Sequence, residues 1–421
     1  MLPPGEPAET TRPEPPTSAS RVALLALVAV WLAFAFPALG GKVRFPAYYA
    51  GPIDGLVERS NPELGDAVLA TYQWRSYMTD RWQGGDVPLW DPHRFAGTPF
   101  AANIVMGLWY PPTWSYALGA DIMWTFTALA LASLLGALLL AYWFLRLLRL
   151  HPYAACLGAI GFACSAFMMK WSAHESIFGS GMWLPLALGG MELIHRGRRA
   201  AGIAACAAGL ALSVLAGHAQ IALYVWYTTA AWGALAGIGR AVRGRGPRAF
   251  AGSVLRSGLV SVVPFLIAAG LAAVQIVPSS ELAGRIIRQQ YSFEQELVTR
   301  LLPEHLPTFL IPDYLGNPVD GNYDGPGAPY LETALYPGVA LLPLAAAGLA
   351  DRRRRRLAGF FAGMAVVGML AALGTPFLRL LLLLPGLDRV YWIDRYVLFV
   401  DVGLAWLAAM GLDLLLRRGT R

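Results

Sequence analysis

Stretches of about 20 apolar residues recur along this chain, and each is long enough to cross about 30 Å of hydrocarbon as a helix. Inside a bilayer every backbone N–H and C=O must find a partner within the protein, which favours helices. The composition, 56% hydrophobic and only 14% charged, excludes an ordinary soluble domain. We therefore expect an all-α polytopic membrane protein. About ten spans are expected, at residues 22–40, 121–145, 154–171, 179–194, 200–217, 219–238, 257–277, 333–350, 357–374 and 396–416.

Basic residues are divided unequally between the two sides of these spans. Alternate connections and both ends of the chain hold most of the 33 lysines and arginines. The arginines on this side are Arg12, Arg21, Arg146, Arg149, Arg196, Arg198, Arg199, Arg240, Arg243, Arg245, Arg248, Arg256, residues 352–356, Arg417, Arg418 and Arg421. The positive-inside rule assigns this side, and both termini, to the cytoplasm. Topology thus accounts for the net charge of +7, and nucleic-acid binding is not expected.

The same reading divides the chain into a membrane domain with two tails. Residues 1–20, rich in proline and without aromatic residues, are expected to form a disordered cytoplasmic tail, and residues 417–421 a short second one. Residues 21–416 are expected to form one transmembrane domain, whose first apolar span is an uncleaved helix rather than a signal peptide. Two large outer loops are expected at residues 41–120 and 278–332.

The outer loop at residues 41–120 combines carboxylates with many tyrosines and tryptophans. Carboxylates supply proton acceptors or metal ligands, and flat aromatic faces suit sugar rings and lipid interfaces. Asp66 is expected at the start of an amphipathic helix that runs to Arg81, where the helix dipole keeps a carboxylate ionised, as a base requires. A helix cap is the alternative role, because aspartate is favoured at that position in any case.

Several short motifs accompany Asp66. They are Tyr72-Gln73, GDVPLWDP at residues 85–92, GTPF at 97–100, GHAQ at 217–220, PDYLG at 312–316 and Arg395 before the last span. With these motifs, residues 22–416 resemble the YfhO-type bacterial membrane proteins, a branch of the GT-C glycosyltransferases. The resemblance implies a GT-C-like fold in the bacterial cytoplasmic membrane and an extracytoplasmic acceptor. It also implies a polyprenyl-phosphate-linked sugar donor and a first-loop aspartate as general base.

Such an enzyme needs a base, a cation for the leaving phosphate and an apolar groove. Asp66 is the first candidate for the base, followed by Asp54 and Asp91. Arg395 is the candidate cation, because a guanidinium at the outer end of the last span can hold phosphate. Its alternative role is an interfacial anchor. The other residues expected to contact substrate are Tyr72, Gln73, Trp90, His174, Glu175, His218 and Gln220.

The sequence also bears on metal binding and on two rival functions. The histidines and carboxylates lack the spacing of a zinc site, so no dedicated metal site is expected, while a divalent cation shared with phosphate is left open. A flippase or transporter of lipid-linked glycans, and a non-catalytic scaffold, are the rivals. A flippase should need charged residues deep inside the spans, where we find little beyond Glu192 and Asp401. This scarcity favours the transferase.

Overall fold

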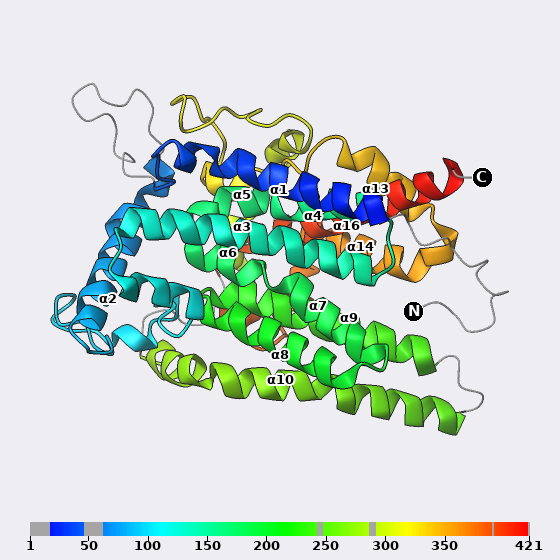
Figure 1. The fold of residues 1–421 in the computed structure, drawn as a ribbon, viewed down its shortest axis with the longest axis horizontal. Coiled ribbons are helices and arrows are strands. Elements are labelled where there is room, and N and C mark those ends of the chain that lie inside the picture. The colour runs from blue at the N-terminus through cyan, green and yellow to red at the C-terminus, as the bar shows by residue number, and fades with distance from the viewer. Residues whose placement is uncertain (1–16, 46–61, 242–246, 286–291, 390, 420–421) are drawn as a thin grey trace.

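The computed structural model describes residues 17–45, 62–241, 247–285, 292–389 and 391–419. Within them the regular elements are helical, and Figure 1 shows the long helices side by side in one bundle. Among the described residues, seven helical segments are long and apolar enough to cross a membrane, so the chain is a polytopic helical membrane protein. They are α1 (Thr17–Leu39), α3 (Ile122–Leu147), α6 with α7 (Glu175–Gly181 and Leu184–His195), α9 (Ala219–Ala241), α10 (Pro247–Ala283), α14 (Arg355–Ala372) and α16 (Val397–Gly419).

An eighth span is formed if a bent pair of helices is counted as one. In this pair α4 (Pro152–Ala163) meets the second half of the span, which starts with α5 (Ala166–Lys170), at an angle of 45°. Asp401 Oδ2 accepts a hydrogen bond from the backbone N–H of Phe167 at 3.0 Å, and Ser165 Oγ accepts one from the N–H of Met168. Irregular backbone at membrane depth is tolerated where protein groups satisfy it in this way. Asp401 therefore has a structural role at the break.

Two of the ten expected spans are shorter in the structure. The expected span at 200–217 corresponds to α8 (Arg199–Leu215), an apolar helix of 17 residues. The prediction of a helix over 333–350 was wrong, since residues 334–340 are not helical and α13 covers only Leu341–Leu349. Its nine residues reach about 14 Å, less than half of the hydrocarbon thickness. Pro337 and Gly338 precede it, and a proline at this position cannot continue a helix begun upstream.

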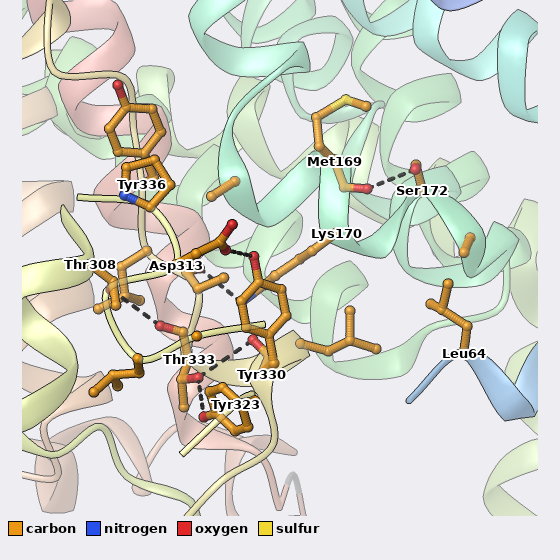
Figure 2. A pocket seen from close by; sticks show the side chains of 18 of the residues that line it. Leu64, Met169, Lys170, Ser172, Thr308, Asp313, Tyr323, Tyr330, Thr333 and Tyr336 are labelled. Atoms are coloured by element: carbon orange, nitrogen blue, oxygen red, sulfur yellow. Dashed lines mark hydrogen bonds between the residues drawn. The ribbon is translucent and has the colours of Figure 1, made fainter. Parts of the chain in front are cut away.

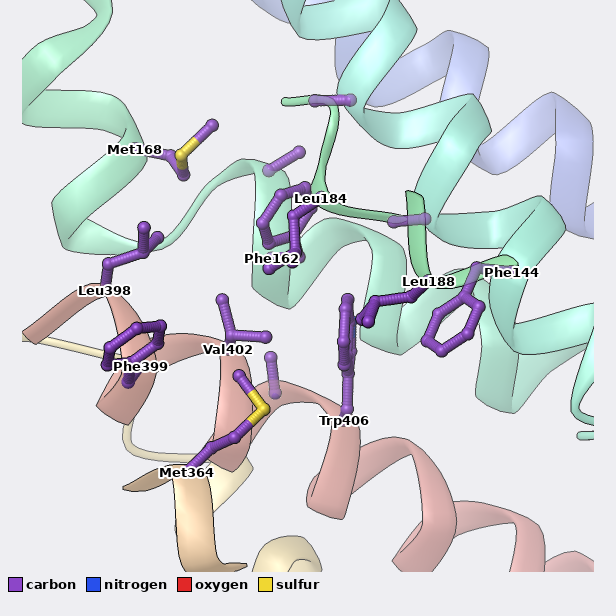
Figure 3. Packing of buried hydrophobic residues seen from close by; sticks show 14 of the residues in the cluster. Phe144, Phe162, Met168, Leu184, Leu188, Met364, Leu398, Phe399, Val402 and Trp406 are labelled. Carbon is purple, nitrogen blue, oxygen red and sulfur yellow. The ribbon is translucent and has the colours of Figure 1, made fainter. Parts of the chain in front are cut away.

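The core of the bundle lies around α16, the most enclosed of the long helices together with α6 and α7. Trp406 is fully buried, and its ring contacts those of Phe144, Phe162 and Phe361 at centroid distances of 5.0, 5.9 and 5.2 Å. Figure 3 shows how Trp406 lies among side chains contributed by α3, α4, α7 and α14. Close packing of α13 on α16 needs Gly411, where an added Cβ would lie 1.9 Å from the carbonyl oxygen of Leu344.

The connections between helices carry short elements at one end of the bundle. The first connection contains η1 (Pro62–Leu64), η2 (Ala67–Tyr72), α2 (Gln73–Gln83), η3 (Phe100–Ala102), η4 (Ile104–Met106) and η5 (Pro111–Leu118). The later connections contain α11 (Phe293–Glu296), η7 (Leu297–Thr299), η8 (Pro303–Phe309), α12 (Tyr330–Thr333), α15 (Leu378–Leu381), η10 (Leu387–Arg389) and η11 (Ile393–Tyr396).

The two ends of the bundle differ in composition. Helix α1 begins and α16 ends at the same end, and α2 lies at the opposite end (Figure 1). We call the first the arginine-rich end, because it holds Arg354 and Arg417, and the second the loop end. Of the expected tails, residues 1–16 lie outside the described residues, whereas residues 17–20 and 417–419 are helical and extend α1 and α16. The apolar character of Ala19 and Val22 continues into the first turn, so the helix starts earlier than expected.

Candidate functional site

Asp66 occupies the helix start that the sequence predicts. It precedes η2, which continues directly into α2 as far as Gln83, two residues beyond the expected end. Its side chain is exposed and makes no capping hydrogen bond. The cap, which was the alternative role for this residue, is therefore not formed, and the carboxylate is accessible at the loop end.

His174 lies within electrostatic reach of both Asp66 and Arg395. Its ring packs edge-on against Trp171 at 4.9 Å, and its Nδ1 is buried without a hydrogen-bond partner. Burial lowers the pKa of His174 to about 4, with Asp66 opposing the shift and Arg395 adding to it. The imidazole is therefore neutral near pH 7.

Arg395 is the centre of a buried ion pair. Its Nη2 and Nε donate to Glu332 Oε1 at 2.6 and 3.1 Å, and the two side chains are only 11% and 3% exposed. Its Nη1 lies 3.0 Å from Nε2 of His218, and its guanidinium lies over the rings of Trp171 and Trp392 at 4.7 and 5.5 Å. The charge of Arg395 is thus balanced within the protein.

Gln220 joins the same cluster through the chain just before Arg395. Its Nε2 donates to the carbonyl of Trp392 at 2.6 Å and to the hydroxyl of Tyr224 at 2.8 Å. The structure therefore brings together His174, His218, Gln220 and Arg395, with Asp66 beside them. These residues come from four distant parts of the sequence.

Glu175 instead fastens the first connection to the bundle. It pairs with Arg75 of α2 at 2.8 Å and accepts a hydrogen bond from the hydroxyl of Tyr116 at 2.6 Å. Arg75 also donates to the carbonyl of Met106 at 2.5 Å. Burial, together with Glu175, raises the pKa of the Tyr116 hydroxyl, so that it remains a donor. These contacts give Glu175 a positioning role for the loop that carries Asp66.

The other candidates of the first connection that the structure describes make contacts outside this cluster. Asp91 is buried, accepts from the backbone N–H of His93 at 2.9 Å and lies 3.6 Å from Arg94. Gln73 accepts from Arg94 at 2.9 Å, and Tyr72 packs edge-on against a phenylalanine at 5.7 Å. Trp90 is 55% exposed, while Asp54 lies outside the described residues. A substrate role for these five residues stays a prediction.

A cavity of about 600 Å³ opens beside the cluster. Leu64 and Ala173, which lie close in sequence to Asp66 and His174, both line it. Figure 2 shows Lys170 reaching from α5 toward Tyr330 and Asp313. Tyr330 donates from its hydroxyl to Asp313 at 2.5 Å, and Glu63 accepts from the backbone N–H of Tyr330 at 2.8 Å. The wall of the cavity is therefore built jointly by the first connection, by α5 and the residues after it, and by the connection between α10 and α13.

Sequence reasoning missed Lys170 and Glu332. The expectation that the spans hold almost no charge was wrong, because Lys170 lies within the bent span and interacts electrostatically with Glu332, Asp394 and Asp401. A lysine closing an apolar run of about 17 residues was the available signal, since such a charge is costly inside a membrane. Glu332 had no local signal, because its partner is 63 positions away.

Among the described residues, no group of three or more histidine, cysteine, aspartate or glutamate side chains could hold a metal ion. No match to this chain is found among protein-family models, curated proteins or solved structures.

Proposed function

We propose that this protein is a glycosyltransferase of the bacterial cytoplasmic membrane. It transfers a sugar from a polyprenyl-phosphate donor to an acceptor outside the cytoplasm, and both termini lie in the cytoplasm. The observation that carries the proposal is the exposed carboxylate of Asp66 beside neutral His174 and next to a largely apolar cavity at the loop end. Nucleotide sugars are cytoplasmic, so transfer on the outer face needs a donor that is carried by a lipid.

The proposed chemistry assigns the proton to Asp66. Its carboxylate takes the proton of an acceptor hydroxyl while the oxygen attacks the anomeric carbon. The bond between that carbon and the phosphate oxygen breaks, and polyprenyl phosphate leaves with the electron pair. Because His174 is neutral, it forms no ion pair that would occupy the carboxylate of Asp66. No cofactor is assigned, and a divalent cation at the leaving phosphate is compatible with this scheme.

The test is transfer of radiolabelled sugar from a panel of polyprenyl-phosphate donors by the purified protein. We expect Asp66→Asn to lose at least about a hundredfold in rate, because general-base assistance contributes roughly 10²–10⁴. Asp86→Asn is the matched control, since Asp86 is an exposed acid of the same connection, paired with Arg81. Full turnover of Asp66→Asn, together with loss in Asp54→Asn or Asp91→Asn, would assign the base elsewhere. Activity in all three would reject the first-loop mechanism.

One observation favours a rival function, the flipping of a lipid-linked glycan. Lys170 inside the bundle supplies a charge that such a protein needs, and its presence removes the main argument against a flippase. The two functions separate in proteoliposomes that contain labelled donor and no acceptor. A flippase moves the label between leaflets in wild type and in Asp66→Asn alike, whereas the transferase moves none.

A further inference from the structure

The cavity beside α5 has more positive than negative charge on its wall. Among the described residues that line it, the charged ones are Arg44, Lys170 and Asp313. Asp313 already accepts the short hydrogen bond from Tyr330, so its carboxylate is engaged. The cavity therefore favours an anion over a cation or a neutral sugar.

Lys170 has donors to offer to such an anion. An ammonium carries three N–H donors, and within the described residues Lys170 makes one hydrogen bond, to the carbonyl of Ala334 at 3.3 Å. Of the carboxylates that interact with Lys170, Glu332 is bound to Arg395. Asp401 accepts a hydrogen bond from the backbone N–H of Phe167, where the bent span is broken. Asp394 balances part of the charge, and both Lys170 and Ala334, whose carbonyl accepts from the ammonium, line the cavity.

Arg44 supplies the second cation on a neighbouring wall. Its Nη2 donates to Ser172 Oγ at 3.2 Å, and Ser172 is two residues beyond Lys170. Its guanidinium also lies over the ring of Phe34 at 5.9 Å. Both of these partners are neutral, so the positive charge of Arg44 is available to a ligand.

The rest of the wall is largely apolar. Val43, Phe45, Leu64, Met169, Leu331 and Leu335 all line the cavity. Its volume of about 600 Å³ lies in the range of small-molecule sites, which combine apolar walls with a few polar groups. A ligand that fits both parts has one anionic group attached to a hydrocarbon chain.

We propose that Lys170 and Arg44 hold the phosphate of an isoprenyl phosphate in this cavity, with its first isoprene units against the apolar wall. The inference rests on the proposed function, because it names the phosphate site of the same donor. It also moves the phosphate from Arg395, as expected from the sequence, to Lys170 and Arg44. Arg395 could take this role only by giving up its ion pair with Glu332, whereas among the described residues Lys170 donates to the carbonyl of Ala334 and Arg44 to the neutral side chain of Ser172.

The test measures binding of geranyl phosphate, a short isoprenyl phosphate, to the purified full-length protein by titration calorimetry. We expect Lys170→Met to weaken binding by about tenfold or more, as for loss of a charge-assisted hydrogen bond, and Arg44→Gln to act in the same direction. Geraniol, which lacks the phosphate, should bind weakly and equally to all variants. Arg285→Met, which removes an exposed cation that does not line the cavity, is the matched control. Gel filtration establishes whether each variant is folded. If Lys170→Met is not folded, binding to Arg44→Gln decides the test.

The outcomes separate this site from the proposed activity. Unchanged geranyl phosphate binding in a folded Lys170→Met or Arg44→Gln overturns the site, even if sugar transfer is observed. Binding that depends on both residues, with no transfer from any donor, retains the site and rejects the transferase. If phosphatidylglycerol in nanodiscs displaces geranyl phosphate at equal concentration, the cavity is a phospholipid site and the isoprenyl assignment falls. Failure of phosphatidylglycerol to compete supports the assignment.

Discussion

Helix α16 has a buried arginine–carboxylate cluster at each of its ends, and the two clusters are built differently. At the arginine-rich end, Asp413 accepts from the backbone N–H of His151 at 2.8 Å and lies 3.0 Å from Arg417. Arg354 lies 3.6 Å from the same carboxylate and donates to the carbonyls of Leu148 and Arg149. These contacts join α16 to the residue that precedes α14 and to the turn between α3 and α4.

At the loop end, the pair of Arg395 and Glu332 is equally buried but lies among groups that lack such partners. Within the described residues, Nδ1 of His174 and both carboxyl oxygens of Glu296 are buried without hydrogen bonds, and a cavity opens beside Lys170. Oδ2 of Asp413, at the arginine-rich end, also has no hydrogen bond of good geometry among these residues, but it has Arg417 and Arg354 as ion-pair partners. Each buried polar group without a hydrogen-bond partner lowers the free energy of unfolding by about 1–3 kcal/mol. The comparison indicates that the arginine-rich end is built for stability, and that the loop end gives up stability to keep polar groups available.

The largest effect should come from breaking the arginine-rich cluster. Asp413→Ala removes the carboxylate that Arg417 and Arg354 share and the acceptor of the His151 N–H, and it leaves Arg417 its ion pair with Asp351. Because three buried contacts are lost, we expect unfolding to become easier by about 3–5 kcal/mol. Denaturant titration in detergent measures this change, and Asp413→Asn, which keeps the acceptor for His151, should cost less. Binding of geranyl phosphate to the remaining folded protein should be unchanged. A cost below about 1 kcal/mol would remove the contrast between the two ends.

Breaking the loop-end pair should cost less, about 2–3 kcal/mol for Glu332→Leu. The loss is smaller because Arg395 keeps His218 and the faces of two tryptophans as partners. Combining Glu332→Leu with Arg395→Met removes both charges and should restore most of the stability, since an apolar pair can replace a buried ion pair. Denaturant titration in detergent measures the stability of the single and double variants. A double variant no more stable than the single one would show that the pair is not the source of the loss.

Sequence reasoning succeeded where the signal is local. Apolar stretches located most of the membrane helices, and Asp66 does stand at a helix start. The span expected at 333–350 failed because hydrophobicity alone does not register the interruption at Pro337. Composition therefore predicts that a segment is buried more reliably than it predicts its conformation.

The contacts of the candidate site were only partly predictable. An outer location at the ends of spans was enough to select His174, His218, Gln220 and Arg395, which do lie together. The partner of Arg395 was not predictable, because Glu332 reaches it through folding of a connection and not through a helical repeat. Lys170 was overlooked because a single charge at the end of an apolar run resembles an interfacial anchor.

The loop end should also make stability depend on pH through Glu296. Burial, aided by Asp388, raises the pKa of the Glu296 carboxyl to about 8. The unfolded chain releases this proton near its ordinary pKa of 4.5 and the folded protein does not, so stability is highest below pH 4.5 and falls up to about pH 8. Between pH 6 and 7 we expect a loss of about 1.4 kcal/mol. Glu296→Gln should remove that slope in denaturant titrations at the two pH values, and an equal slope in both proteins would contradict it.

The smallest effect is expected where an ion pair of good geometry lies in water. Glu281 lies on the last turn of α10 and Arg285 two residues beyond its end; the two are 2.6 Å apart, but the side chains of Arg285 and Glu281 are 75% and 65% exposed. Solvent screens such a pair, so Arg285→Met should change the free energy of unfolding by less than about 0.5 kcal/mol. Its shortest N–O distance equals that of Arg395 and Glu332, but the buried pair has in addition a second hydrogen bond from Nε of Arg395. A loss comparable to that of Glu332→Leu would mean that the N–O distance, and not burial or the second hydrogen bond, decides the strength of ion pairs at this end of the protein.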